Sequence, residues 1–328
     1  MRSEITDAGA GRLVAVVVTH QRLHQLERTI ARLLESPAHE LSAIVVIDNA
    51  SSDGTPAWLS AQDDPRLHVH RSEVNLGGAG GFEMGVRIAC ADHEPDWLLL
   101  TDDDGRPGPG ALARFHALPA GKWDAVAAAV YLPGGAICDM NRPALNPFDH
   151  LPVMARSMAG GGREGFHLGP EDYAGPARRV DIASFVGFFV SAGAVSRAGL
   201  PEGRLFLYAD DSLYTLRMTR AGARIGFEPS IVFEHDCSTF SGRPGQFTPV
   251  WKSYYYHRNL LLLYRLAAGW LFWPAMLAVL PKWLLRTRVQ SRGKRAPYLR
   301  LLGLALRDGL MGHTGRGHAV VLRAAGED

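Results

Sequence analysis

The chain from residue 13 to about residue 130 alternates short, continuously apolar runs with longer segments of helical periodicity. The runs at 13–19, 41–49 and 96–101 lack polar alternation, as expected of strands that are covered on both faces of a sheet. Between the first two, residues 23–36 place aliphatic side chains three and four positions apart, which predicts an amphipathic helix. Strands that alternate with helices predict an α/β fold with a mostly parallel, doubly wound sheet.

The pattern becomes weaker after these strong elements. Two further strands and a helix are predicted at 67–72, 124–132 and 79–91. Residues 133–178 are rich in glycine and proline, and we expect an irregular segment that is mobile or lies beside an acceptor. Regular structure returns with a helix at 206–222 and a pair of strands at 224–236.

The last part of the chain has a different character. We therefore expect a division into a catalytic domain at 1–248 and a helical region at 249–328. Residues 266–281 carry no charge, yet this run is shorter than the about 20 apolar residues of a spanning helix. Three tryptophans and a basic run follow one another here: Trp270, Trp273 and Trp283, then residues 286–300. Such a segment, 266–300, favours a helix lying on an anionic membrane surface over one packed on the protein.

Composition narrows the classes of function. The near-balanced net charge of +2 favours no nucleic-acid partner. The three cysteines are widely spaced without a CxxC pair, which argues against a disulfide framework or a zinc ribbon and suits a reducing compartment. The first twelve residues have no apolar core of a signal peptide, so we expect a cytoplasmic location.

Three consecutive carboxylates, Asp102, Asp103 and Asp104, stand where a buried strand is predicted to end. Asp followed by Gly105 and Pro107 is also good turn chemistry, so a turn and a metal site are both open on this stretch alone. In doubly wound sheets, however, ligands bind at the carboxyl ends of the strands. Other polar side chains are predicted at the same edge, which favours the metal site.

Two further clusters of residues do not indicate a function by themselves. Residues 75–85 are glycine-rich before a predicted helix, where backbone N–H groups can approach a pyrophosphate, although the pattern is not the dinucleotide-binding fingerprint. Asp210 and Asp211 begin another predicted helix, where an N-cap or a favourable interaction with the helix dipole is the simpler interpretation.

The order of these segments resembles a known family. "VVVTHQR", "VVIDNASSDGT", "NLGGAGGF", "WLLLTDDDG", "FVGFFVS", "FLYADDSLYTLR", "VFEHD" and "SYYYHRNLLLLYR" follow one another as in the GT-A glycosyltransferases of family 2. The likeness is greatest to the bacterial rhamnosyl- and galactofuranosyltransferase-like branch, and it covers residues 13 to 265. It implies a GT-A fold with a helical C-terminal extension.

The resemblance implies roles on the donor side. Thr19 corresponds to the position bordering the nucleobase, and Asp48 to the aspartate that binds the base and ribose of a uracil or thymine nucleotide. Asn75 and Gly77 lie where the family contacts the nucleotide sugar, as does Asp103 within the three carboxylates. The donor is accordingly expected to be a UDP- or dTDP-linked sugar.

The resemblance also implies a metal and a base. Asp102 and Asp104 fill the DxD positions that hold Mn²⁺ or Mg²⁺, with Asp102 also on the donor, and His235 matches a histidine that completes the metal site in some members. Asp211 matches the general base, preceded by Asp210 in the usual acidic pair. The family's reaction is an inverting transfer to a hydroxyl of a glycan or lipid-linked acceptor in cell-envelope polysaccharide synthesis.

One position departs from the family, and two other functions stay open. Leu213 stands where many members carry a second acidic residue, which leaves acceptor binding in doubt. One alternative is a non-catalytic, membrane-attached protein that binds sugar nucleotides. The other is a phosphatase of the haloacid dehalogenase type, because "LLLTDDDGRP" imitates its nucleophile motif. A homo-oligomer attached to the inner face of the cell membrane is compatible with the expected function.

Overall fold

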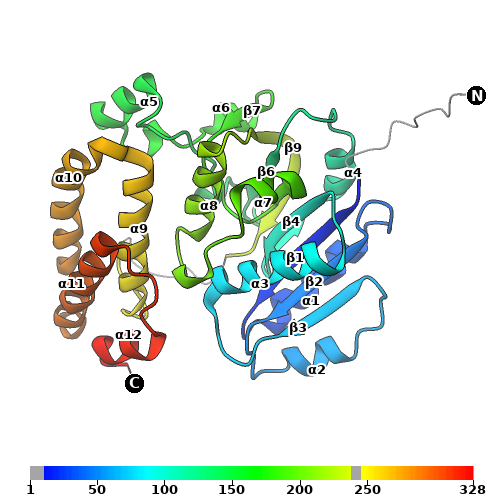
Figure 1. The fold of residues 1–328 in the computed structure, drawn as a ribbon, viewed down its shortest axis with the longest axis horizontal. Helices are drawn as coiled ribbons and strands as arrows, with labels where there is room; N and C mark the ends of the chain where they lie inside the picture. Colours follow the sequence, from blue (N-terminus) through cyan, green and yellow to red (C-terminus); the bar gives the residue numbers. More distant parts are fainter. Residues whose placement is uncertain (1–10, 238–244, 328) are drawn as a thin grey trace, which may run out of the picture.

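The protein was analysed as a computed structural model, which describes residues 11–237 and 245–327. The amino-terminal stretch on which the prediction about a signal peptide depends lies almost wholly outside the described residues. An α/β part built on one large sheet occupies one side of the molecule, and a group of C-terminal helices occupies the other (Figure 1).

Four parallel strands form one half of the sheet, in the order β3-β2-β1-β4. They are β3 (Leu67–Arg71), β2 (Ala43–Asp48), β1 (Leu13–Thr19) and β4 (Trp97–Asp102). Every residue of β1 and β2 is buried, which explains why both appear in the sequence as unbroken apolar runs. The predicted strands and their parallel arrangement are confirmed in this half.

The other half of the sheet is mixed. It contains β8 (Phe188–Ser191), β6 (Ala125–Tyr131), β9 (Ile225–His235) and two short strands, β5 (Gly105–Pro107) and β7 (Arg178–Val180). Strand β8 lies antiparallel between β4 and β6, whereas β6 and β9 pair in parallel. The mostly parallel α/β fold is confirmed, with an antiparallel strand in its centre that local periodicity does not reveal.

The pair of strands predicted at 224–236 is wrong, because the structure has one long strand, β9, in that place. Its register against β6 shifts after Ala128, where Glu228 is followed by Val232 as the next paired residue. The irregularity inserts extra residues and bends the strand without ending it. Pro229, which lies in this insertion, is typical of a turn. The strand tolerates it because the hydrogen bonds between β6 and β9 are already interrupted there.

Helices cover both faces of the sheet (Figure 1). Alternate residues of a strand point to opposite faces, so β1 contributes Val14, Val16 and Val18 to one core and Leu13, Ala15 and Val17 to the other. The first core includes side chains of α3 (Gly77–Asp92), α7 (Ala192–Ala198) and α8 (Asp210–Arg220). The second includes α1 (Leu23–Leu34), α2 (Thr55–Ser60) and α4 (Ala111–His116).

The segment 133–178 has no long element, as predicted, but it does contain short helical turns. These are η1 (Asp139–Asn141), α5 (Leu151–Arg156), η2 (Ser157–Gly161), η3 (Gly162–Gly165) and α6 (Pro170–Tyr173). A further short turn, η4 (Gly203–Leu205), comes before α8.

The C-terminal helices pack around a core of their own. They are α9 (Lys252–Ala268), α10 (Phe272–Leu285), α11 (Arg295–Met311) and α12 (His318–Ala325), with short turns at η5 (Gly269–Leu271), η6 (Arg286–Arg288) and η7 (Arg292–Lys294). Gly269 adopts a positive φ of 53°, which ends α9 and turns the chain into α10. The division into domains at residue 248 stays a prediction.

Candidate active site

The parallel strands bring distant polar residues to one edge of the sheet. In the register of the sheet, Thr19 at the end of β1 pairs with Asp48 at the end of β2, and Val18 pairs with Asp102 at the end of β4. The carboxyl ends of these three strands therefore lie side by side, as the sequence predicts.

His235 reaches the same edge through antiparallel pairing. Strand β5 follows the three aspartates directly, and its Gly105 pairs with His235 at the end of β9. This register places His235 Nε2 3.1 Å from Asp104 Oδ1. The potential ligand atoms of Asp102, Asp104 and His235 all lie within 4.8 Å of one another, and two carboxylates with an imidazole can hold a divalent cation.

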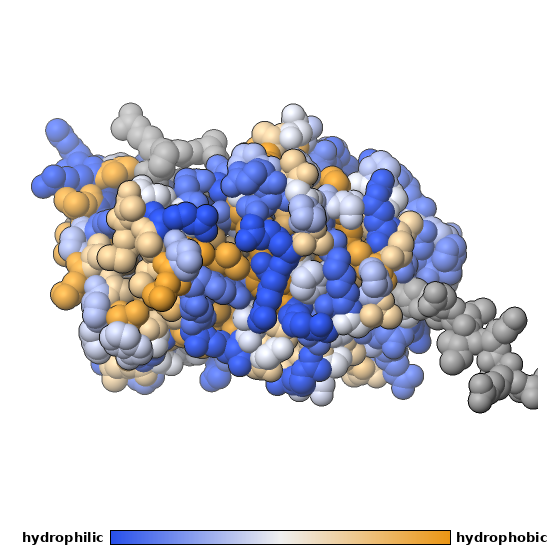
Figure 2. All heavy atoms as spheres, turned by 90° about the horizontal axis from the view of Figure 1, so that it is seen from above, coloured by the Kyte–Doolittle hydropathy of each residue, from blue (hydrophilic) through white to orange (hydrophobic). Residues whose placement is uncertain are grey.

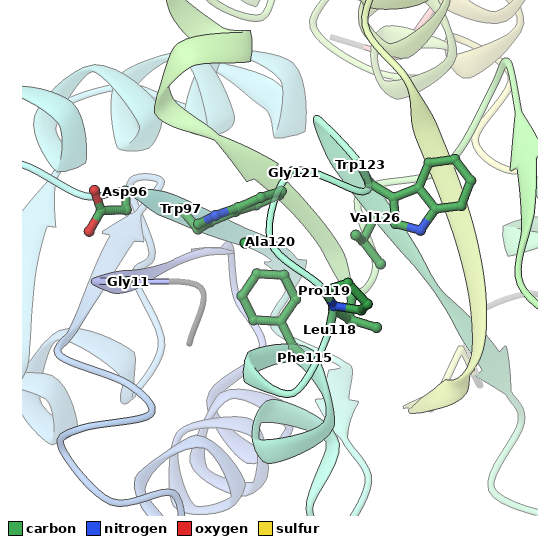
Figure 3. A pocket seen from close by; sticks show the side chains of 10 residues that line it. All are labelled: Gly11, Asp96, Trp97, Phe115, Leu118, Pro119, Ala120, Gly121, Trp123 and Val126. Atoms are coloured by element: carbon green, nitrogen blue, oxygen red, sulfur yellow. The ribbon is translucent and has the colours of Figure 1, made fainter. Parts of the chain in front are cut away.

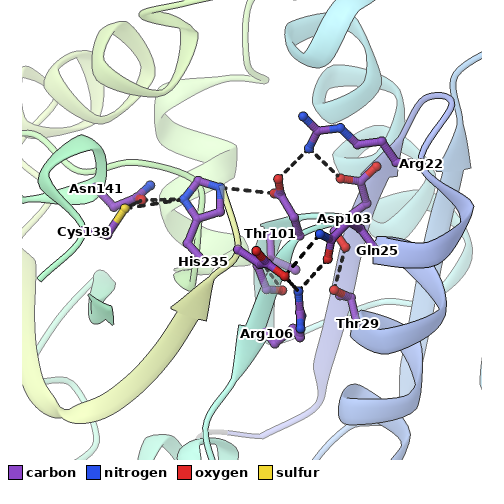
Figure 4. A network of polar contacts seen from close by, with 12 residues as sticks. Arg22, Gln25, Thr29, Thr101, Asp103, Arg106, Cys138, Asn141 and His235 are labelled. Carbon is purple, nitrogen blue, oxygen red and sulfur yellow. Dashed lines mark hydrogen bonds and ion pairs between the residues drawn. The ribbon is translucent and has the colours of Figure 1, made fainter. Parts of the chain in front are cut away.

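The other ring nitrogen of His235 faces a separate group of side chains (Figure 4). Its Nδ1 donates to Asn141 Oδ1 at 2.7 Å, and the Asn141 amide is itself oriented by donating to Ser184 Oγ at 2.9 Å. This hydrogen bond turns Nε2 toward the carboxylates, as partners of metal-binding histidines commonly do. Cys138 Sγ also donates to Asn141 Oδ1, and Cys138, Cys237 and His235 form a second group with ligand atoms within 4.8 Å.

The charges of this cluster are unevenly satisfied. Desolvation and the nearby charge of Asp104 raise the pKa of Asp102 to about 6. Desolvation would also raise the pKa of Asp104, but the hydrogen bond and charge of His235, together with Arg22, lower it. The pKa of His235 rises to about 10, because its contacts with Asp104 outweigh the desolvation that would lower it. The charge of Asp104 is thus neutralised by His235 and Arg22, whereas the charge of Asp102 is poorly compensated by the protein.

Asp103 points to a different set of partners. It accepts a hydrogen bond from Thr19 Oγ1 at 2.8 Å. Arg22 Nη1 lies 3.3 Å from its other oxygen (Figure 4). Arg22 also contacts Asp104, so one guanidinium bridges neighbouring carboxylates. Desolvation raises the pKa of Asp103 to about 7 although Arg22 opposes the shift. The sequence analysis did not predict these contacts of Arg22. The position of Arg22 shortly after the end of a strand is the feature that could have indicated them.

Buried side chains hold the turn of the three aspartates from below. Thr29 Oγ1 donates to the backbone oxygen of Asp103 at 2.6 Å, and Thr101 Oγ1 donates to that of Gly105 at 3.0 Å. A Cβ on Gly105 would stand 2.5 Å from Thr101 Oγ1, so the turn closes only around glycine. Arg106 is 4% exposed and lies between Gln25 and Asp236 in the same network (Figure 4).

Asparagines organise the glycine-rich loop before α3. Asn49 donates to Gly77 O at 2.9 Å and accepts from Leu76 N at 2.8 Å, while Asn75 Oδ1 accepts from Gly77 N at 2.8 Å. Gly77 has a φ of 71°, which favours glycine. The loop is thereby fixed beside Asp48, whose Oδ1 accepts from Ser51 N at 2.9 Å. The sequence analysis did not predict that Asn49 holds this loop.

The acidic pair Asp210 and Asp211 begins α8, four residues later than the helix predicted at 206–222. The helix starts late because Phe206, Tyr208 and Ala209 have positive φ angles. Desolvation and the charge of Asp211 raise the pKa of Asp210 to about 8. The pKa of Asp211 is also raised by desolvation, against hydrogen bonds from Ser212 that lower it. Leu213 follows in the first turn of the helix.

The sequence of this chain is similar to those of known proteins. Residues 14–137 match the model of the family described as glycosyl transferase family 2. A galactofuranosyltransferase, GlfT1, of Mycolicibacterium smegmatis is 28% identical over 239 residues, which cover 70% of this chain and 72% of that protein. Residues 14–137 therefore form a glycosyltransferase family 2 domain. Within the family it is similar to the galactofuranosyltransferase-like branch.

Solved structures support the fold. GalNAc-T7 with UDP, GalNAc and Mn²⁺ superposes with a TM-score of 0.58 at 13% identity, over 95% of this chain and 56% of that one. The mannosyltransferase PcManGT of Pyrobaculum calidifontis, in complex with GDP-Man and Mn²⁺, gives a TM-score of 0.53 at 18% identity, over 97% and 81%. At these identities the likeness bears on the fold alone, and it confirms the GT-A prediction.

A cavity of about 410 Å³ lies elsewhere on the protein (Figure 3). Its lining includes Trp97 at the start of β4 and Gly11, just before β1, with Phe115, Trp123 and a turn at 118–121. The starts of these strands form the edge of the sheet opposite to the carboxylates. The cavity therefore forms no part of the candidate active site.

Proposed function

We propose that this protein is an inverting, metal-dependent glycosyltransferase that moves a sugar from a UDP- or dTDP-linked donor to a hydroxyl of a glycan or lipid-linked acceptor in cell-envelope synthesis. The observation that carries the proposal is the convergence of Asp102, Asp104 and His235 at the carboxyl edge of the sheet, with Asp211 close enough to influence the pKa of Asp102. The similarity to a galactofuranosyltransferase supports the cell-envelope role and makes galactofuranose the first donor sugar to test.

The donor would lie along the ends of β1, β2 and β4. Asp48 is 1% exposed, and its Oδ2 accepts no hydrogen bond but lies 3.4 Å from Arg71 Nε, so this oxygen is the one we propose for the base or ribose. Thr19 would border the base while it anchors Asp103. The loop of Asn75 and Gly77 offers backbone to the nucleotide sugar where α3 begins, and a helix N-terminus favours an anionic ligand.

The residues present fit a Mn²⁺ or Mg²⁺ ion. Asp102 and Asp104 provide the hard oxygen ligands that such ions prefer, and His235 adds a nitrogen whose direction Asn141 fixes. The raised pKa of Asp102 marks a carboxylate that is short of positive charge, which a cation would supply. When bound, the ion would stabilise the charge that develops on the departing diphosphate.

Asp211 is proposed as the general base. Desolvation raises the pKa of both carboxyl groups, and the charge of Asp211 raises that of Asp210 further, so we propose that Asp210 is the member of the pair that holds a proton and that Asp211 carries the charge. A raised pKa makes a carboxylate a better proton acceptor, and such catalysis is typically worth 10²- to 10⁴-fold in rate. Asp211 would accept the proton of the acceptor hydroxyl as its oxygen attacks the anomeric carbon opposite the leaving diphosphate. A single displacement of this kind inverts the anomeric configuration.

We propose further that α10 lies on a membrane surface. By length and composition alone, residues 252–288 qualify as a membrane-crossing candidate, and most of their apolar part is not buried inside the protein. However, the turn at Gly269 divides them, and α10 with its 14 residues is about 21 Å long, less than the about 30 Å of a hydrocarbon core. A helix lying in the plane of the membrane fits better than one that crosses it.

The exposed side chains of α10 suit that orientation. Trp273, Leu277 and Leu284 are 63%, 79% and 54% exposed and follow one another at helical spacing, so they share one face. Apolar surface gathers over the end of the molecule that these helices occupy (Figure 2). Trp283, which the sequence suggested as an interfacial residue, is 4% exposed and packs in the helical core instead. Basic residues after Lys282 would attract anionic lipids on the cytoplasmic face, where a lipid-linked acceptor is accessible.

The test of the proposed function is a screen of sugar nucleotides. The purified protein is incubated with UDP-galactofuranose, UDP-galactopyranose, UDP-glucose or dTDP-rhamnose and Mn²⁺, with octyl glycosides as acceptors, and release of nucleoside diphosphate is measured. We expect release with one donor class, dependent on the ion and abolished by chelation. Binding of a sugar nucleotide without turnover under every condition would favour the non-catalytic alternative. Absence of both binding and turnover would contradict the proposal.

A further inference from the structure

The loop that delivers the acidic pair has an unusual backbone. Phe206, Tyr208 and Ala209 have φ angles of 68°, 69° and 57°, and Asp210 follows immediately as the first residue of α8. Residues other than glycine rarely adopt this left-handed region, because the Cβ atom crowds the backbone. Three such residues within four positions persist only when the surrounding structure holds them, and they lie next to the proposed base.

Asn259 of α9 holds this loop through a single amide. Its Nδ2 donates to the backbone oxygens of Leu205, Leu207 and Tyr208, at 3.0, 2.9 and 2.8 Å. The amide thus supplies a donor to Leu207 O and Tyr208 O in a loop without regular structure, and a further donor to Leu205 O, which also accepts from Leu207 N at 2.8 Å. Asn259 is 0% exposed, so water does not replace its amide there.

Arg258, the preceding residue, fixes the amide and adds contacts of its own. Its Nε donates to Asn259 Oδ1 at 2.8 Å, which sets the direction of the Asn259 NH₂ group. Its Nη2 donates to Leu205 O at 2.7 Å and to Arg204 O at 3.3 Å. The guanidinium lies 5.2 and 5.1 Å from the ring centroids of Tyr254 and Tyr255 and is 0% exposed. A fully buried arginine thus directs its donors to the loop before α8.

The opposite side of the loop contacts the donor side of the site. Ala79 N donates to Phe206 O at 3.2 Å, and a Cβ on Gly77 would stand 2.1 Å from the same oxygen. The Phe206 ring stacks on Tyr255 with centroids 4.7 Å apart. The loop is therefore held between the start of α3 and helix α9, which lie in different parts of the chain.

We propose that Arg258 and Asn259 are positioning residues for the general base, because they fix the left-handed backbone that sets where Asp211 stands at the sheet edge. The inference rests on the proposed function, in which Asp211 accepts the acceptor's proton. It assigns a part in the reaction to two adjacent buried residues of the C-terminal helices. These helices would then serve catalysis as well as membrane attachment.

The test compares two neighbouring buried residues of α9. Asn259→Asp keeps the shape of the side chain and its contact with Arg258 but removes the donors to the three carbonyls. His257→Phe is the matched control, because His257 is equally buried on the same helix and its Nε2 contacts Tyr298 of α11, away from the loop. Each variant is examined for kcat and donor Kd with the donor selected by the screen, for Tm, and for hydrogen exchange of residues 203–213. Asn259→Ser, which retains one donor, replaces Asn259→Asp if that variant does not fold.

We expect Asn259→Asp to lower kcat by about tenfold or more with donor Kd changed less than about twofold, because only the base has moved. Hydrogen exchange at 203–213 should accelerate in this variant and not in His257→Phe, at comparable losses of Tm. If both variants lower kcat in proportion to Tm, or if exchange at 203–213 is unchanged by Asn259→Asp, the positioning role is wrong.

A double variant separates this inference from the proposed function. If Asn259 acts through Asp211, then Asp211→Asn combined with Asn259→Asp should have about the same kcat as Asp211→Asn alone, because the losses are coupled and not additive. Additive losses would overturn the positioning role and leave the base in place. A normal kcat in Asp211→Asn alone would overturn the base assignment itself, whatever the exchange data show for the loop.

Discussion

The carboxyl edge of the sheet and the core of the C-terminal helices both withdraw polar side chains from water, but they satisfy them differently. At the sheet edge, Asp102 and Asp210 have pKa values raised to about 6 and about 8, since desolvation and neighbouring carboxylates disfavour their charged forms. In the helices, Arg258 and Asn259 donate to fixed backbone oxygens.

This difference indicates what each region is for. Carboxylates that the protein leaves poorly compensated carry a cost in stability that a cation or substrate can remove, and such groups mark functional sites. Polar groups that are fully engaged with backbone oxygens hold structure in place. The sheet edge is therefore where ligands should matter, and the helices are where changes should act on geometry and stability.

The largest effect is expected from Asp104→Ala. Removing this carboxylate takes away one ligand of the proposed ion and the partner of His235, so the gain in UDP affinity that Mn²⁺ provides should disappear. Calorimetric titration of UDP with and without Mn²⁺ measures this gain. Asp139→Ala, at an exposed carboxylate outside the cluster, should retain it. An undiminished effect of Mn²⁺ in Asp104→Ala would contradict the metal assignment.

Asp211→Asn should lower kcat by at least about 10²-fold, because the amide cannot accept the proton of the acceptor. Donor affinity should change little, since the base acts on the other substrate. Steady-state kinetics with varied donor and acceptor measures both quantities. Should kcat stay near normal, Asp210 is the next candidate, and Asp210→Asn would then show the large loss.

The two regions should depend on pH with opposite signs. The folded pKa of His257 is lowered to about 3 by desolvation, so the unfolded state binds the extra proton below about pH 6.5 and stability falls as the pH falls. From pH 6.5 to 5 the loss is about 2 kcal/mol. The folded pKa of Asp210 is raised, so the folded state holds the extra proton above about pH 4 and stability falls as the pH rises toward 8.

Thermal unfolding of two variants checks these signs. His257→Phe should flatten the decline in Tm between pH 6.5 and 5, and Asp210→Asn should raise Tm more at pH 8 than at pH 5. The wild-type protein in the same buffers is the reference for each. The comparison of the two regions fails if both variants shift Tm equally at all pH values.

The smallest effect is expected at the surface of α10 and the turn before it. Trp270→Ala with Trp273→Ala removes side chains that are 86% and 63% exposed and should weaken binding to anionic vesicles by about tenfold while Tm stays unchanged. Co-sedimentation with vesicles of anionic or neutral lipid, at low and high salt, measures it. Val74→Ala is a control at an exposed apolar residue of the sheet part. If the wild-type protein stays in the supernatant throughout, this surface contacts protein and not lipid.

Much of the fold and part of the site could be predicted from local pattern. The strand predicted at 13–19 coincides with β1, because a strand buried on both faces must be apolar throughout. The aspartates at strand ends were equally visible, since the carboxyl edge of a parallel sheet follows from the strands alone. By contrast, the helix predicted at 206–222 begins only at Asp210, because contacts from α9 hold the preceding loop in a conformation its own residues disfavour.

The sequence by itself determined the strands of the parallel half of the sheet, the carboxylates that stand at their ends, and the resemblance to glycosyltransferase family 2. These properties depend on short-range periodicity and on the order of motifs, and both can be observed directly in the amino-acid sequence. Only the tertiary structure decided that His235 faces Asp104, that Arg22 bridges two aspartates, and that Asn259 holds the loop before Asp211. The physical reason is that these contacts join residues far apart in sequence, whose meeting depends on strand order and register across the whole sheet.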